Sequence, residues 1–205
     1  MVLHSNGIWY IHPKTTWTVK EVNMYFDKPG KDNTDKTLKF AAERGKELDI
    51  DEVVVASSTG KTAYKAMELF EGYRLTVVTY HCGFKEPFKN RMTDEVRKDI
   101  ESKGMRVIAS SHALSWVERS VAKKNFGIYP VLLIADTLRL LVQGTKVTVE
   151  VTVMAADAGT LTGADIISIG GSSSCADAAL FLEPAHRNIF FGLRIREIIW
   201  KPRVF

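Results

Sequence analysis

The segment at residues 57–62 combines the residue types that proteins use to bind phosphate groups. It reads Ser-Ser-Thr-Gly-Lys-Thr, follows a β-branched run at residues 53–55 and precedes an alanine-rich stretch with helical spacing. This order predicts a buried strand, a tight loop and a helix N-terminus. Free backbone N–H groups, hydroxyls and the ammonium of Lys61 would then meet at the positive end of a helix dipole. The segment therefore predicts a phosphate site.

Three other interpretations of this loop compete with the phosphate site. Gly60-Lys61-Thr62 looks like the end of a Walker A motif, but that motif needs a glycine five residues before Gly60, and Val55 stands there. Ser58 and Lys61 match the Ser-x-x-Lys spacing of penicillin-binding enzymes, but the companion elements of those enzymes are absent from the sequence. A plain strand-to-helix turn, in which Ser and Thr only cap the helix, stays open.

Small or polar residues also follow the other strands that the sequence predicts, at residues 75–79, 105–109, 146–154 and 165–169. In an open α/β sheet, ligands bind beyond the carboxyl ends of the parallel strands, so we expect these loops to lie beside the phosphate loop. Glycines among them would let the backbone approach a ligand closely. The candidate binding residues are Ser57, Ser58, Thr59, Gly60, Lys61, Thr62, Thr79, His81, Gly83, Phe84, Ser111, His112, Asp157, Gly170 and Gly171.

Several of these residues also have a structural interpretation. His81 and His112 could be histidines satisfied at the edge of the core, and Asp157 could simply cap a turn. Cys82 or Cys175 could instead be the nucleophile of a thiol-dependent hydrolase, with His81 or His112 as its paired histidine. A metal site could be built from His81, His112 and Asp157, but no short spacing of metal ligands supports it, so no metal site is predicted.

Composition places the chain among ordinary globular proteins. It has 205 residues, of which 45% are hydrophobic and 25% charged, and a net charge of +4. Basic residues are interleaved with acidic ones, which disfavours nucleic-acid binding. No apolar run is long enough to cross a membrane. The first residues do not resemble a signal peptide, and the two cysteines lie far apart, so we expect a cytoplasmic protein with free thiols.

The order of the elements predicts an α/β protein. Residues 1–20 have aromatic residues without a clear period and are expected to form an N-terminal arm, which could pack on the body or on a second subunit of a homo-oligomer. Residues 21–205 are expected to form one domain. Its strands are predicted at residues 22–26, 53–55, 75–79, 105–109, 146–154, 165–169, 178–182 and 194–200. Helices are predicted from residue 33 or 34, from 61, at 93–102, and at 116–141 with a break near Gly127 and Pro130. This alternation predicts a three-layer α/β/α sandwich with a mostly parallel sheet.

A family resemblance becomes visible from these segments. Residues 53–63 resemble the strand and loop of the pyruvate kinase C-terminal domain that grip the phosphate of a sugar bisphosphate effector. Over about residues 22–203, the chain resembles an archaeal group of stand-alone proteins related to that domain. The residues that carry this resemblance are Tyr25-Phe-Asp-Lys-Pro-Gly30, Asn33-Thr34, Val54-Val-Ala-Ser-Ser58, Val78-Thr-Tyr-His81, Ser111-His112, Met154-Ala-Ala-Asp157 and Pro184-Ala-His186.

The resemblance implies the same three-layer fold and no pyruvate kinase activity, because the catalytic barrel of that enzyme has no counterpart here. Flavin mononucleotide (FMN) has been seen in the pocket of relatives, which implies FMN as the ligand. Tyr80, Phe84, Met154 and the pair Gly170-Gly171 would then form the walls around a flavin ring. A regulatory module that senses a sugar phosphate is the alternative, and whether the protein is an enzyme stays open.

Overall fold

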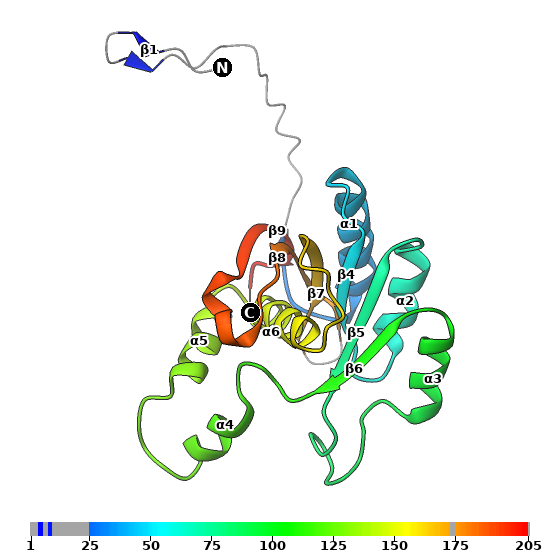
Figure 1. Ribbon diagram of the computed structural model, residues 1–205, viewed down its shortest axis with the longest axis vertical. Helices are drawn as coiled ribbons and strands as arrows, with labels where there is room; N and C mark the ends of the chain where they lie inside the picture. The colour runs from blue at the N-terminus through cyan, green and yellow to red at the C-terminus, as the bar shows by residue number, and fades with distance from the viewer. Residues whose placement is uncertain (1–3, 6–7, 10–24, 173–174, 205) are drawn as a thin grey trace.

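A seven-stranded sheet organises the computed structural model, which describes residues 4–5, 8–9, 25–172 and 175–204. The strand order is β3-β9-β8-β7-β4-β5-β6 (Figure 1). Its strands are β3 (Tyr25–Phe26), β4 (Glu52–Ala56), β5 (Arg74–Tyr80), β6 (Arg106–Ser110), β7 (Ile166–Gly170), β8 (Ala178–Glu183) and β9 (Arg194–Pro202). Of these seven strands, only β8 runs against the others. The predicted mostly parallel sheet is confirmed.

Six α-helices are found in the described ranges. They are α1 (Thr34–Glu47), α2 (Lys61–Leu69), α3 (Asp94–Ser102), α4 (Trp116–Ala122), α5 (Pro130–Arg139) and α6 (Gln143–Asp157). Short 3-10 helices occupy Lys31–Asn33 and Arg187–Gly192. Thr93 caps α3 as predicted, because its side chain accepts a hydrogen bond from the Val96 N–H at 3.4 Å. Within the described residues, no helix has both the length and the apolar character that crossing a membrane requires.

The helices cover both faces of the sheet, and the alternation of side chains along each strand decides which helices they meet. Val53 and Val55 join the core beneath α1, α2 and α3, whereas Val54 joins the core beneath α5 and α6. Figure 1 shows α1, α2 and α3 on one side of the sheet and α6 across the other. The three-layer α/β/α sandwich that the sequence predicts is therefore confirmed.

The prediction of a strand at residues 146–154 is wrong, because this segment belongs to α6. Its valines alternate with polar residues, which is the period of a strand. In the structure, 12 of the 15 residues of α6 are buried, and a helix that is buried all round needs no apolar stripe at helical spacing. The hydroxyls of Thr148 and Thr152 donate to the carbonyls of Thr145 and Thr148 at 2.7 and 2.9 Å. These bonds satisfy polar threonines inside the core.

The N-terminal predictions are tested only in small part. Strands β1 (His4–Ser5) and β2 (Ile8–Trp9) pair with each other in antiparallel fashion. The rest of the arm predicted at residues 1–20, and residues 22–24 of the predicted first strand, lie outside the described residues. The last two residues of that predicted strand form β3.

The path of the chain creates a crevice beside β4. From β4 the chain passes through α2 to its neighbour β5 and then through α3 to β6. It next returns through α4, α5 and α6 to β7, which lies on the opposite side of β4. The loops that follow β4 and β7 therefore leave the sheet in different directions. Such a switch point at the carboxyl ends of parallel strands is where α/β proteins bind ligands.

Candidate functional site

The loop between β4 and α2 has the geometry that a phosphate site needs. The Ser57 N–H still donates to the Val78 carbonyl at 2.9 Å, so the loop leaves the sheet directly after this residue. Gly60 then turns the chain into α2 with φ of 92°. A Cβ atom at Gly60 would lie 2.5 Å from Cγ1 of Val96, so both the backbone angle and the space require glycine here.

Five consecutive backbone N–H groups at this turn are free to bind a ligand. Among the described residues, the N–H groups of residues 58–62 have no hydrogen-bond acceptor. The next N–H, that of Ala63, donates to the buried hydroxyl of Ser57 at 3.3 Å, so the Ser57 side chain caps the N-terminus of α2. The hydroxyl of Thr79 donates to the carbonyl of Ser58 at 3.2 Å and thereby holds the loop. Unpaired N–H groups at a helix N-terminus attract anions.

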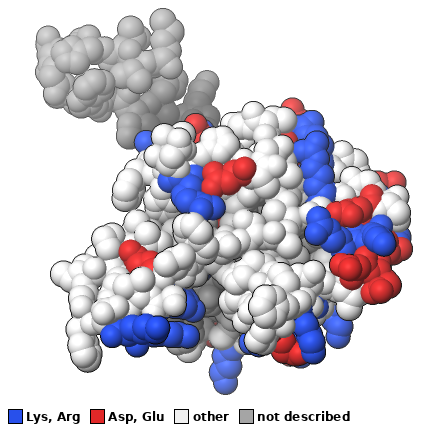
Figure 2. Space-filling view, turned by 60° about the horizontal axis from the view of Figure 1, so that its bottom comes forward, with Lys and Arg blue, Asp and Glu red and all other residues white. Residues whose placement is uncertain are grey.

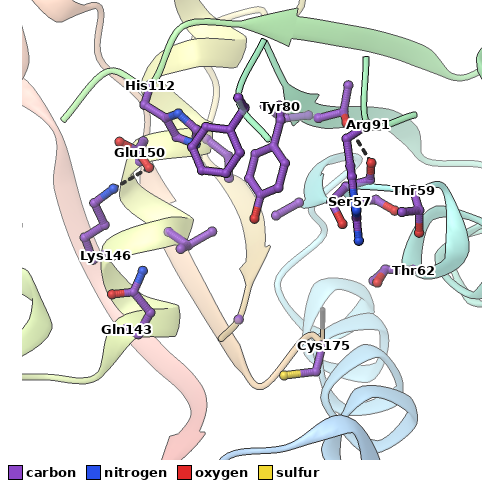
Figure 3. Close-up of a pocket in the computed structure, with 18 of the residues that line it drawn as sticks. Ser57, Thr59, Thr62, Tyr80, Arg91, His112, Gln143, Lys146, Glu150 and Cys175 are labelled. Atoms are coloured by element: carbon purple, nitrogen blue, oxygen red, sulfur yellow. Dashed lines mark hydrogen bonds and ion pairs between the residues drawn. The ribbon is translucent and has the colours of Figure 1, made fainter. Parts of the chain in front are cut away.

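A cavity of about 540 Å³ opens beside this loop (Figure 3). Its volume lies within the range of small-molecule sites. One wall comes from the β4–α2 loop and the start of α2, and the opposite wall comes from α6 with contributions from α4 and α5. The lining residues are Lys31, Thr34, Ala56, Ser57, Ser58, Thr59, Lys61, Thr62, Lys65, Val78, Thr79, Tyr80, Phe84, Arg91, His112, Ser115, Arg119, Arg139, Gln143, Lys146, Val147, Glu150, Val151, Met154, Gly171 and Cys175.

The charge of the cavity is strongly positive. Seven of its lining residues are lysine or arginine, and Glu150 is the one acidic residue among them. Within the described ranges, only three of these cations have an acidic partner: Lys65 with Asp35, Arg139 with Asp136, and Lys146 with Glu150. Elsewhere on the surface basic and acidic side chains lie side by side in several places, as Figure 2 shows for one face. The modest net charge of the chain therefore hides a local surplus of positive charge in the cavity.

The α6 wall is built around a buried ion pair. Lys146 and Glu150 lie one helical turn apart and are 3% and 2% exposed. One carboxylate oxygen of Glu150 binds the ammonium of Lys146, and the other accepts the Leu114 N–H at 2.9 Å. Through this second bond, Glu150 fixes the loop after β6 that carries His112. Burial lowers the pKa of both Lys146 and His112, because each loses the hydration that its charged form needs.

Aromatic rings gather where β5 ends. The rings of Tyr80 and Phe84 stack with their centroids 4.1 Å apart, and His112 lies 4.8 Å from Phe84. His81 meets His112 edge to face at 5.5 Å. Valine and methionine side chains of β5 and α6 line the cavity nearby. The cavity thus has an apolar middle between two basic walls.

The structure brings most of the sequence-predicted residues to this cavity. Those that line it are Ser57, Ser58, Thr59, Lys61, Thr62, Thr79, Phe84, His112 and Gly171. Gly60, His81, Gly83, Ser111, Asp157 and Gly170 are not among the lining residues. Gly60 shapes the turn, and Gly170 allows close packing, because a Cβ there would lie 2.9 Å from the carbonyl oxygen of Gly144. The contact of any of these residues with a ligand stays a prediction.

Asp157 occupies a different place from the one predicted. We expected it in a loop at the carboxyl end of a strand, but it is the last residue of α6. Its carboxylate accepts the Arg187 N–H at 3.1 Å and pairs with the Arg187 guanidinium at 3.1 Å and with His186 at 3.3 Å. Asp157 therefore ties the end of α6 to the segment after β8. Reading α6 as a strand caused this error.

Because residues 146–154 were predicted to form a strand, the polar cavity-lining residues of α6 were not predicted as site residues. Gln143, Lys146 and Glu150 line the cavity from successive turns of α6, but a strand would have distributed them along a sheet edge. The spacing of Lys146 and Glu150 was the available signal, since a Lys and a Glu four residues apart pair on a helix. Arg119 and Arg139 come from α4 and α5, and nothing in their local sequence indicates that they face a cavity.

Cys175 lines the cavity but has the wrong electrostatics for a nucleophile. Its thiol donates to the Ser172 carbonyl at 2.8 Å and lies 3.5 Å from Asp177. Burial, reinforced by the charge of Asp177, raises the pKa of Cys175 to about 11, so almost none is thiolate at neutral pH. Cys82 is exposed. In the described part of the chain, no three His, Cys, Asp or Glu residues lie close enough together to hold a metal ion.

Comparison with known proteins shows distant similarity to pyruvate kinases. A pyruvate kinase from Cryptosporidium parvum is similar at 11% identity over 72% of this chain, with a TM-score of 0.37. A pyruvate kinase of the same organism in complex with ADP is similar at 14% identity over 78% of this chain, with a TM-score of 0.39. This chain covers 22% and 25% of those two chains. No family model matches the sequence.

Proposed function

We propose that this protein binds a phosphorylated small molecule, with the phosphate held by the loop between β4 and α2. The observation that carries the proposal is the row of five N–H groups at residues 58–62 beside the ammonium of Lys61, all without a hydrogen-bond or ion-pair partner in the described part of the chain. A phosphate oxygen accepts several such bonds at once, and each is strengthened by the charge. The hydroxyls of Thr59 and Thr62 also line this end of the cavity.

FMN is the first candidate for the ligand. The residues present fit its parts: the phosphate corresponds to the free N–H groups, and the flavin ring to the apolar middle formed by Tyr80, Val147, Val151 and Met154. The cavity volume also lies in the range of sites for ligands of this kind. A bound flavin would supply redox chemistry, whereas these cavity residues would bind and orient it.

A titration distinguishes FMN from other ligands. We expect the flavin fluorescence to be quenched on binding, and we expect FMN to bind at least tenfold more tightly than riboflavin, which lacks the phosphate. Equal affinity for the two would contradict the phosphate assignment. A protein that is colourless after purification and gives no calorimetric signal with FMN would remove FMN as the ligand and leave other phosphate esters.

A sugar bisphosphate sensor is the second candidate, and the second basic wall favours it. Arg119 and Arg139 lie across the cavity from the phosphate loop, and their charges contribute to the lowered pKa of Lys146, which places them near it. A ligand with an anionic group at each end would neutralise both walls, whereas FMN has its phosphate at one end only. A ligand that binds only the folded state raises the melting temperature. A larger shift with fructose 1,6-bisphosphate than with FMN at equal concentration would support the sensor and displace the flavin.

A further inference from the structure

Lys146 is an unusual residue to find in a cavity wall. Lysine is almost never fully buried unless it is paired; Lys146 is only 3% exposed, is paired with Glu150, and still lines the cavity. Its partner Glu150 is held in turn by the Leu114 N–H. The amine is therefore fixed in position, and Figure 3 shows it on the wall opposite Ser57 and Thr59.

The surroundings of Lys146 favour the neutral amine more than those of an exposed lysine. Burial is the main cause of its lowered pKa, and the charges of Arg139 and Arg119 act in the same direction. Lys146 is also the fourth residue of α6, where the helix dipole opposes a positive charge. Glu150 acts against these effects but does not cancel them. A desolvated lysine next to other cations is an activated nucleophile.

We propose that Lys146 forms an imine with the carbonyl carbon of a phosphorylated aldehyde whose phosphate lies in the loop at residues 58–62. The proposal rests on the proposed function for the phosphate end of the ligand, and it adds a chemical role for the opposite wall. The cavity connects the two sites, because its lining includes both Lys61 and Lys146.

The reaction requires no further reactant. Glu150 accepts a proton from the Lys146 ammonium, which leaves a lone pair on Nζ. This pair forms the bond to the carbonyl carbon while the electrons of the C=O double bond move to the oxygen. The oxygen takes one proton from the nitrogen and a second from Glu150, which returns to its carboxylate form. Loss of that oxygen as water gives the C=N bond. The balance is one amine plus one aldehyde giving one imine plus one water.

Pyridoxal 5′-phosphate and pyridoxal are a matched pair of probes, since they share the aldehyde and differ in the phosphate. The full chain is incubated briefly with either probe near pH 7 and reduced with borohydride, which converts the imine to a stable secondary amine. Peptide mapping by mass spectrometry then identifies the labelled lysines. Lys39 is the internal comparison, because it pairs with Glu43 at the same spacing on α1 but is exposed.

We expect Lys146 to be labelled by pyridoxal 5′-phosphate at least about tenfold faster than Lys39, because the phosphate loop would hold the aldehyde of the probe in the cavity that Lys146 lines. Pyridoxal should label Lys146 about tenfold more slowly than its phosphate ester, and inorganic phosphate should protect it. The double variant Lys146→Met with Glu150→Gln removes the amine without leaving a buried charge, and it should lose this label. Lys39→Met should keep it.

The possible failures are distinguishable. If Lys39 is labelled as fast as Lys146, or if Lys146 is not labelled, the proposal that Lys146 forms an imine is wrong. The proposed phosphate site at residues 58–62 is not affected by that result. Lys146 could instead be labelled rapidly by both pyridoxal and its phosphate ester, without protection by inorganic phosphate. That would support a reactive amine at Lys146. That result would contradict the phosphate site at residues 58–62.

Discussion

Replacing Lys61 by alanine tests the phosphate loop through the charge of a single side chain. Lys61 is the first residue of α2, it is exposed toward the cavity, and within the described residues it has no acidic partner. Its ammonium would therefore make one charge-assisted bond to the phosphate, worth about 1.5–3 kcal/mol. Lys61→Ala should then raise the dissociation constant of FMN about ten- to a hundredfold. The five N–H groups would remain, so binding should be weakened but not abolished.

The assay is a fluorescence titration of each variant with FMN and with riboflavin. Riboflavin should bind Lys61→Ala and the parent protein about equally, because it has no phosphate for the ammonium to contact. Lys39→Ala is the control, since it removes an exposed lysine of α1 that does not line the cavity and should leave both affinities unchanged. Folding should change little, because a lysine in the first turn of a helix opposes its dipole. Equal losses for riboflavin and FMN would refute the reasoning, since Lys61 would then act on the ring or on the fold.

Three further predictions follow from the geometry. Gly60→Ala should lower the free energy of unfolding by about 1–3 kcal/mol in urea, because the added Cβ would meet Val96. Gly72 has a similar positive φ but open space around it, so Gly72→Ala should lower it less. Equal losses would mean that backbone strain alone requires glycine at residue 60. Cys175 should react with iodoacetamide at pH 7.5 far more slowly than the exposed Cys82, and faster reaction at Cys175 would restore the thiol-dependent hydrolase. Because the pKa of His112 is lowered in the folded protein, the unfolded chain binds more protons near and below pH 6.5, so stability should fall as the pH drops through that range. His112→Asn should reduce this pH dependence of the urea midpoint, and an unchanged slope would contradict the assignment.

The parallel half of the sheet could be predicted from sequence because its strands carry a local signal. Residues 53–55 and 75–79 are short β-branched runs that end in turn residues, and they form most of β4 and β5. The break between α4 and α5 was also predictable, because Gly127 and Pro130 mark it. Pro130 stands at the first position of α5, where its missing N–H costs nothing.

Helix α6 could not be predicted in the same way, and its position decides half of the site. A valine–threonine alternation has the period of a strand, and only burial on all sides makes it compatible with a helix. That burial comes from the strands of the sheet, most of which lie far from α6 in sequence, and from α5, which packs against α6 only in the folded protein. Consequently the loop at residues 57–62 was found, whereas Lys146, Glu150 and the arginines of α4 and α5 were not.

The most direct test of the phosphate site is the response of individual backbone amides to the ligand. In ¹H–¹⁵N correlation spectra of the labelled protein, the amide signals of residues 58–62 should shift on addition of FMN, because their free N–H groups gain acceptors. Riboflavin at the same occupancy should shift these signals much less while it moves the signal of Met154 in the apolar middle. If FMN shifts other amides but leaves those of residues 58–62 in place, the phosphate does not bind this loop and the account is wrong.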